Sequence, residues 1–145
     1  MPAEIACQQE SEQAFNELEQ LFNNQRRAFA ANPMPLAGQR LQWLKTLRTL
    51  LSDERQALVD AINSDFSHRS ADETLLAELM PSLLGIQYAS KHLKKWMKPS
   101  RRHVGMAFQP ASAKVIYQPL GVVGVIVPWN YPLFLAIGPL VGALS

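Results

Sequence analysis

An asparagine interrupts the most apolar part of this sequence. Asn130 lies between Trp129 and Tyr131, and no charged residue occurs from residue 115 to residue 145. One role for it is to cap the helix that follows, because asparagine oxygens often accept from the first backbone N–H groups of a helix. The other is catalytic: its NH₂ group can point into a cleft and stabilise a developing oxyanion. Local sequence leaves both roles open.

Other side chains that often carry chemistry lack suitable neighbours. The single cysteine, Cys7, has no histidine or other base nearby, so an ordinary thiol is favoured over a nucleophile. The histidines lack the i, i+4 pairing of a metal-binding helix, so no metal site is predicted at His68, His92 or His103. Gly121 and Gly124 do not form a Gly-x-Gly-x-x-Gly phosphate turn, and a tightly packed strand is the better interpretation.

Positive charge is concentrated in one segment. The formal net charge is +2, yet all twelve acids lie at or before Glu78, while residues 91–114 hold seven bases and no acid. Because these bases surround Trp96, a basic nucleic-acid-binding module over residues 91–103 is one alternative. A solvated helix end is favoured, since the segment is short and other parts of the chain are acidic. We therefore expect no nucleic-acid partner.

Composition allows one packed domain and raises a membrane alternative. The 145 residues are 48% hydrophobic and 18% charged, which suffices for a core. One cysteine and an N-terminus without a secretory pattern predict a cytoplasmic protein. The uncharged segment 115–145 exceeds the roughly 20 residues that a membrane helix needs, so a membrane-anchored helical protein is possible in principle. Its four prolines and Asn130 would interrupt such a helix, so no membrane span is expected.

Hydrophobic spacings of three, four and seven predict helices in the first part of the chain. One is expected over residues 11–31 and another over residues 41–51. A short third helix should start at Asp53, with Gln56 completing a capping box.

A long helix is expected after residue 70. Ser70 and Glu73 form a capping box at its start, and Pro99 follows its end. Pro81 should kink or split it, because proline lacks an N–H and crowds the carbonyl four residues back.

The pattern changes to β-branched runs after residue 112. Residues 114–118 and 121–127 are expected to form strands, the second buried on both faces as in a parallel sheet. An apolar helix should begin at Pro132. This order predicts an α/β fold, in which N-terminal helices precede the opening strands and helix of a doubly wound, Rossmann-like domain. Functional residues are then expected at residues 128–132, beyond a strand end.

The same segment resembles a known enzyme family. The run Gly121-Val-Val-Gly-Val-Ile-Val-Pro-Trp-Asn-Tyr-Pro-Leu133 is similar to the aldehyde dehydrogenase superfamily, as are the flanking Tyr117-Gln-Pro-Leu120 and Ile137-Gly-Pro-Leu-Val-Gly-Ala-Leu144. The sequence of this run most resembles class 3 fatty and aromatic aldehyde dehydrogenases and bacterial coniferyl aldehyde dehydrogenases. Nearly the whole chain is similar to the family's N-terminal third.

The resemblance implies an enzyme that oxidises an aldehyde with NAD or NADP as acceptor. Asn130 matches the asparagine that stabilises the oxyanion. Four positions match the lining of the cofactor cleft: Ile126, Val127, Pro128 and Trp129. Tyr131 and Leu135 match positions on the substrate tunnel, where an aromatic ring would suit an aromatic or long-chain aldehyde.

The resemblance also implies how the chain is divided. Residues 1–112 would form the helical part of the cofactor domain, residues 113–119 part of the oligomerisation strand, and residues 120–145 the first strand and helix of the NAD(P)-binding core. A homodimer or homotetramer is implied for the complete enzyme. The family's nucleophilic cysteine and general-base glutamate would follow Ser145, so this chain is expected to be an N-terminal fragment, inactive alone.

Overall fold

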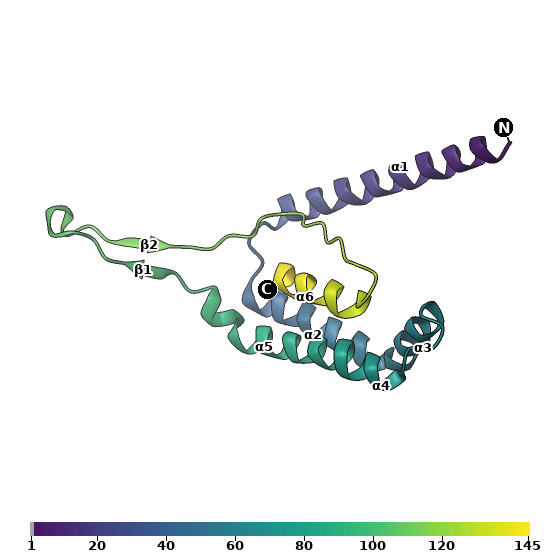
Figure 1. Ribbon diagram of the computed structural model, residues 1–145. Helices are drawn as coiled ribbons and strands as arrows, with labels where there is room; N and C mark the ends of the chain where they lie inside the picture. The colour runs from purple at the N-terminus through teal and green to yellow at the C-terminus, as the bar shows by residue number, and fades with distance from the viewer. Residues whose placement is uncertain (1) are drawn as a thin grey trace. The chain divides into compact units, whose positions relative to one another are not determined.

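Helices make up most of the computed structural model, which describes the backbone of residues 2–145 and side chains from residue 11 onward (Figure 1). The α-helices are α1 (Pro2–Ala31), α2 (Ala37–Asp53), α3 (Arg55–Asp65), α4 (Ala71–Thr74), α5 (Met80–Trp96) and α6 (Pro132–Leu144). The other elements are the π-helical turn η1 (Leu75–Leu79), the 3₁₀ turn η2 (Met106–Phe108) and the strands β1 (Ser100–Arg102) and β2 (Ala113–Val115). The chain divides into two compact units, which we describe separately.

The smaller unit combines α1 with Pro119–Gly124. The helix expected over residues 11–31 is confirmed by α1, although four members of its apolar stripe are exposed: Phe15, Leu18, Leu21 and Phe22. Gly121 lies against this helix with a φ of +109°, a backbone conformation that glycine adopts readily. A Cβ at this position would lie 3.7 Å from the ring of Phe29.

The larger unit, Pro35–Gln118 with Val125–Ser145, has one apolar core among α2, α5 and α6. Apolar residues recur at three- and four-residue spacing in these helices, so each presents an apolar stripe to its neighbours. The buried members of this core are Leu44, Leu51, Leu79, Ile86, Ala89, Ile137 and Val141. The helices expected over residues 41–51 and from Pro132 are thereby confirmed.

The third helix begins near the expected residue but without the predicted cap. α3 is short, as predicted, and its N-cap is Glu54, which makes no side-chain cap hydrogen bond. Asp53 instead ends α2, so the capping box predicted from Asp53 and Gln56 is wrong. The Gln56 amide donates to the carboxylate of Asp60 at 2.9 Å, one helical turn later.

The second predicted capping box is also wrong in its hydrogen bonds. Ser70 is the N-cap of α4, as expected, but makes no side-chain cap hydrogen bond. The Glu73 carboxylate accepts from the guanidinium of Arg69 at 3.1 Å instead of reaching back to Ser70. The guanidinium carries a positive charge and the backbone N–H of Ser70 does not, so the carboxylate gains more from Arg69.

The predicted interruption at Pro81 is confirmed. The helical path from residue 71 to residue 96 is divided by η1, which ends two residues before the proline. Pro81 offers no N–H to the carbonyl of Ala77, and single π turns are a common local adjustment inside helices. This turn carries Glu78 and Leu79, both buried.

The strand expected over residues 121–127 is not formed. Val123, Val125 and Ile126 are exposed, so the prediction of a strand buried on both faces is wrong. A parallel strand needs a neighbouring strand for its backbone N–H and C=O groups, and the described residues place none beside this segment.

The other predicted strand is shorter than expected and has a partner that the sequence did not reveal. β2 covers Ala113–Val115 rather than residues 114–118 and is exposed throughout. It pairs antiparallel with β1, with Ser100 opposite Val115.

Candidate functional site

A short loop, residues 128–131, leads into α6 and carries Asn130. The helix starts at Pro132, where a missing N–H is harmless because the first helical N–H has no partner within the helix. Its N-cap, Tyr131, makes no side-chain cap hydrogen bond. The next backbone N–H groups are instead bound by a carboxylate from an earlier helix.

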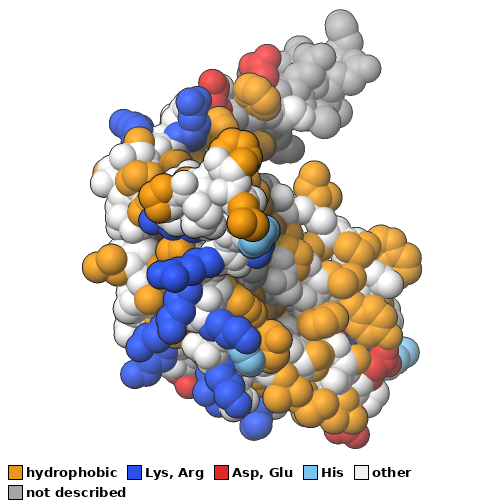
Figure 2. All heavy atoms as spheres, turned by 90° about the vertical axis from the view of Figure 1, so that its left-hand side faces the viewer, with side chains coloured by type: hydrophobic (Ala, Val, Ile, Leu, Met, Phe, Trp, Pro, Cys, Tyr) orange, Lys and Arg blue, Asp and Glu red, His pale blue; other side chains and the backbone are white. Residues whose placement is uncertain are grey.

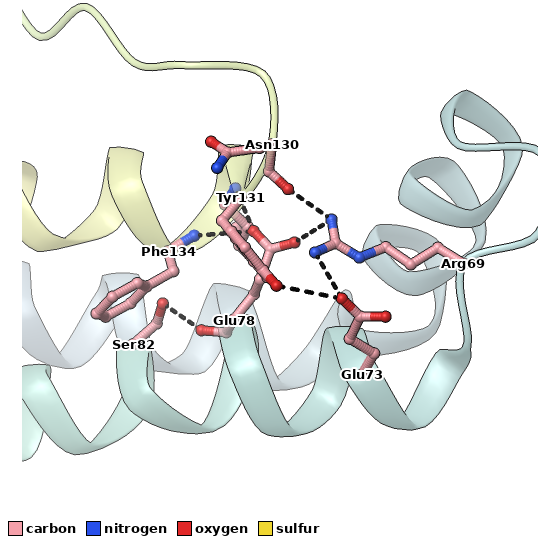
Figure 3. Close-up of polar contacts among 8 residues, drawn as sticks. Arg69, Glu73, Glu78, Ser82, Asn130, Tyr131 and Phe134 are labelled. Atoms are coloured by element: carbon pink, nitrogen blue, oxygen red, sulfur yellow. Dashed lines mark hydrogen bonds and ion pairs between the residues drawn. The ribbon is translucent and has the colours of Figure 1, made fainter.

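Glu78 supplies that carboxylate from η1. Its Oε2 atom accepts from the backbone N of Leu133 at 2.8 Å and of Phe134 at 3.2 Å (Figure 3). Glu78 is fully buried. Two backbone donors and the positive end of the α6 dipole stabilise negative charge at this point. Glu78 is therefore a remote N-cap for α6.

Arg69 connects this carboxylate to the asparagine loop. Its Nη1 atom lies 3.1 Å from Glu78 Oε1 and donates to the backbone carbonyl of Asn130 at 2.9 Å. Its Nη2 atom donates to Glu73 Oε1 at 3.1 Å. No hydrogen bond is directed at Glu78 Oε1, so the contact between Arg69 and Glu78 is an ion pair only. The amide of Asn63 donates to the Arg69 carbonyl at 2.9 Å and holds its backbone.

Aromatic rings enclose the guanidinium. The Arg69 Cζ atom lies 4.8 Å from the ring centre of Phe66 and 4.4 Å from that of Tyr131, within the range of cation–π attraction. The Tyr131 hydroxyl also donates to Glu73 Oε1 at 3.3 Å. The rings of Phe66 and Trp129 have centroids 6.2 Å apart. We call Arg69, Glu73 and Glu78 the charged triad.

Asn130 does not cap the helix. The N-cap of α6 is Tyr131, and the bond that Asn130 makes to the triad uses its backbone carbonyl. Figure 3 shows its side-chain amide on the side of the loop away from the Arg69 guanidinium, and the residue is exposed. The helix-cap interpretation is therefore wrong, whereas the oxyanion role stays a prediction.

The remaining predicted site residues divide into two groups. The structure brings Trp129, Asn130 and Tyr131 together beside the charged triad and Phe66. Leu135 meets this cluster through its backbone, where its N donates to the Tyr131 carbonyl at 3.1 Å. In the described part of the chain, no hydrogen bond, ion pair or ring contact of the cluster involves Ile126, Val127 or Pro128. Ile126, Pro128 and Trp129 are exposed, while Val127, Tyr131 and Leu135 are half-buried.

Sequence reasoning missed the charged triad. Glu78 had a detectable signal, because it is the last acid of the chain and lies among the leucines of an apolar helix face, next to Leu79. A lone carboxylate at a core position requires a partner, since a buried unpaired charge is costly. Arg69 had no such signal, as it stands in a polar stretch before Ser70.

The histidines and the cysteine were the other candidates for chemistry. Cys7 lies outside the residues whose side chains are described. The rings of Tyr88, His92 and Trp96 form one cluster, in which the His92 centroid lies 4.1 Å from that of Tyr88 and 5.9 Å from that of Trp96. Among the side chains that the structure describes, no group of three or more histidine, cysteine, aspartate or glutamate residues is placed to hold a metal ion.

The basic and the uncharged segments gave rise to the two alternative functions. The lysines that end α5 are exposed, and Figure 2 shows Lys and Arg side chains gathered on one part of the surface. Nucleic-acid binding by residues 91–103 stays an untested alternative. Within the described chain, every helix is too short or too polar to cross a membrane. The helix in the uncharged segment, α6, has 13 residues.

Comparison with known proteins decides the family. The model of the aldehyde dehydrogenase family matches residues 3–145. The chain belongs to the aldehyde dehydrogenase family. It is 70% identical over 145 residues to the probable coniferyl aldehyde dehydrogenase of Pseudomonas aeruginosa, covering all of this chain and 30% of that protein. It is 38% identical over 120 residues to the aldehyde dehydrogenase family 3 member B1 of Rattus norvegicus, covering 83% of this chain and 25% of the relative.

A solved aldehyde dehydrogenase structure has the same fold over this segment. The substrate-bound state of Staphylococcus aureus AldH matches with a TM-score of 0.83 and 26% identity, over 88% of this chain and 28% of that one. The expected fold class, the opening part of an aldehyde dehydrogenase, is thereby confirmed. This aldehyde dehydrogenase chain spans less than a third of the relatives that it matches.

Proposed function

We propose that this chain forms the N-terminal part of an NAD(P)-dependent aldehyde dehydrogenase. Its substrate would be an aromatic, coniferyl-like aldehyde or a medium- to long-chain aliphatic aldehyde, which is oxidised to the carboxylic acid. The names of the relatives support this substrate class. The structural observation that carries the proposal is the exposed amide of Asn130 on a loop whose backbone is held by Arg69.

In this reaction, Asn130 would donate a hydrogen bond to the oxyanion. Negative charge develops on the aldehyde oxygen when a nucleophile adds to the carbonyl carbon. A donor that is already fixed in place stabilises this charge without reorganising during the reaction. The bond from Arg69 to the Asn130 carbonyl supplies such fixation, because it holds the backbone from which the amide projects.

The cofactor would lie against residues 126–129. Ile126 and Trp129 expose large apolar side chains, and Pro128 is exposed between them. Apolar side chains of this kind commonly line cofactor sites, so these residues fit the flat rings of NAD or NADP. The bound cofactor supplies the acceptor for the aldehyde hydride. Ile126, Val127, Pro128 and Trp129 would bind and orient it.

Other residues would contact the substrate and join copies of the chain. Tyr131 and Leu135 are half-buried beside the Asn130 loop and would contact the aldehyde, the tyrosine through its ring. Residues 113–119 would join copies into a homodimer or homotetramer, since Ile116 and Tyr117 are exposed. We retain residues 1–112 as the helical part of the cofactor domain and residues 120–145 as the start of its core. The enzyme would act in the cytoplasm.

The test is replacement of Asn130 in the complete enzyme. Asn130→Ala should lower turnover roughly 10²- to 10³-fold, the effect of losing one oxyanion donor. Stability should change little, because the amide caps no helix. Asn130→Asp keeps the size but places a carboxylate beside the oxyanion, so we expect a folded and nearly inactive enzyme. An Asn130→Asp enzyme with normal turnover would disprove the proposal.

A further inference from the structure

We propose that Glu78 is a positioning residue for the Asn130 amide, acting through the N-terminus of α6 and through Arg69. The proposal rests on the proposed function, because it assigns Glu78 a part in the same reaction. Glu78 is fully buried and cannot reach a substrate on the exposed side of the loop. Its effect must therefore pass through the residues that it binds.

The contacts of Glu78 reach the asparagine loop from two directions. On one side, Oε2 holds the backbone N of Leu133 and Phe134, which fixes the first turn of α6. On the other side, Oε1 lies 3.1 Å from the guanidinium that binds the Asn130 carbonyl. The peptide group that joins Asn130 to Tyr131 and the N–H groups of Leu133 and Phe134 are thus held by one connected set of charges (Figure 3).

A buried carboxylate is a poor choice for stability alone. Ion pairs inside proteins often contribute no more than well-packed apolar residues of similar size. Glu78 lies among apolar residues of the core, next to Leu79 and one turn after Leu75. What the carboxylate offers beyond an apolar side chain is one oxygen that accepts from two backbone N–H groups and a negative charge that pairs with Arg69. Glu78 therefore holds the loop that carries Asn130 in a fixed position at the start of α6.

The direction of these bonds suits the proposed role of Asn130. Arg69 holds the carbonyl on one side of the loop, and the amide projects on the other side. The carbonyl and the side chain are both attached to the Cα atom of Asn130, so a displacement of the backbone at this residue would move both. A misplacement of about 1 Å in a catalytic group can cost about 10²-fold in rate. Loss of Glu78 should therefore slow catalysis while the Asn130 side chain is still present.

The experiment is Glu78→Gln in the full-length enzyme. Glutamine keeps the volume, but its NH₂ group must face either the guanidinium or the backbone N–H groups, and neither accepts a hydrogen bond. We expect kcat to fall roughly 10- to 10²-fold. The KM for the aldehyde should change much less, because ground-state binding does not use the oxyanion contact.

A double variant separates positioning from stability. If Glu78 acts through Asn130, adding Glu78→Gln to Asn130→Ala should cause no further loss of kcat. Leu93→Ala is the matched control, since Leu93 is fully buried in α5 about four helical turns from Glu78. This control should lower the melting temperature but leave kcat per folded enzyme unchanged.

The outcomes distinguish the two proposals. Normal turnover in Asn130→Ala would overturn the proposed function itself. Slow turnover in Asn130→Ala combined with normal kcat in Glu78→Gln, or losses that multiply in the double variant, would overturn only the positioning role. If Glu78→Gln does not fold, Arg69→Lys takes its place, because lysine keeps the charge but not the two-pronged geometry that binds Asn130 and Glu73. Normal kcat in Arg69→Lys would equally overturn the positioning role.

Discussion

Two halves of the uncharged segment have similar composition and opposite structures. α6 is helical over 13 residues and buries Ile137 and Val141 in the core. The segment 116–127 forms no helix or strand, and Ile126 is fully exposed. An α-helix satisfies most backbone N–H and C=O groups internally, whereas a strand must find a neighbour. Apolar composition alone therefore does not decide which segment forms a helix or a strand.

The polar groups that α6 cannot satisfy alone are few. The first backbone N–H groups of any helix lack internal partners, and here one carboxylate binds two of them. A strand at residues 121–127 would need partners along its whole length. The helix α6 thus needs one remote side chain to satisfy its backbone, whereas residues 121–127 would need a complete neighbouring strand.

The largest expected effect is on the remote cap. Glu78→Leu removes the acceptor for two N–H groups and leaves Arg69 without its buried partner, which should cost about 3–5 kcal/mol. The measurement is the free energy of opening of α6 amides by native-state hydrogen exchange in the complete enzyme. Glu73→Gln is the control: the Glu73 side chain is 47% exposed, so the loss should stay below about 1 kcal/mol. Equal losses in the two variants would mean that the cap of α6 does not depend on Glu78.

A matched pair of isoleucines tests the comparison directly. Ile137→Ala removes a core side chain and should lower the free energy of unfolding of the 145-residue chain by about 2–5 kcal/mol. Ile126→Ala removes a fully exposed side chain and should change it by less than about 0.5 kcal/mol. Urea unfolding measures both. A large loss in Ile126→Ala would show that residues 116–127 are packed after all.

The exposed apolar segment should also make the 145-residue chain self-associate. Leu120 and Ile126 are almost wholly exposed and Val125 is exposed, while Val122 and Leu140 are half-buried. Exposed apolar surface of this kind favours association. Light scattering should show a mass that rises with concentration, and Ile126→Lys should reduce that rise. A monomer at all concentrations would contradict this expectation. NADH formation from an aldehyde by this chain alone would contradict the separate expectation that the chain is inactive by itself.

The smallest effect is expected at the local cap. Ser70 occupies the N-cap of α4 but makes no side-chain cap hydrogen bond. Ser70→Ala should therefore change the free energy of unfolding by less than about 0.5 kcal/mol, whereas a functioning serine cap contributes about 1 kcal/mol. Urea unfolding measures this change, and the Ile137→Ala variant, measured in the same way, provides a large loss for comparison. A loss of 1 kcal/mol or more would restore the capping box that the sequence predicted.

Helices and their interruptions could be predicted from the sequence because they depend on local signals. The break at Pro81 follows from its missing N–H, and the start of α6 follows from Pro132. Whether residues 121–127 form a strand could not be predicted in this way, because a strand requires a neighbouring strand, which no local pattern reports. β1 was missed for the same reason: three residues paired only with β2 leave a weak local pattern.

The site could be predicted only in part. Asn130 stood out as an amide in an apolar run, and the resemblance pointed to the residues beside it. The predicted capping boxes are wrong because the side chains bond to distant or charged partners instead of to the nearest backbone N–H groups. Glu78 contacts Leu133 across 55 positions of sequence, and no local spacing rule connects residues so far apart.

That separation has a consequence for the order of folding. Closing a loop of 55 residues costs entropy of roughly 3.5 kcal/mol plus a constant, because the cost grows with the logarithm of loop length. Contacts between α2, α5 and η1 close shorter loops and can form earlier. The α6 N-terminus is then completed late, once Glu78 is already in place. A nascent chain would thus acquire an ordered Asn130 loop only after its helical core has assembled, so early folding intermediates would lack the arrangement on which the reaction depends.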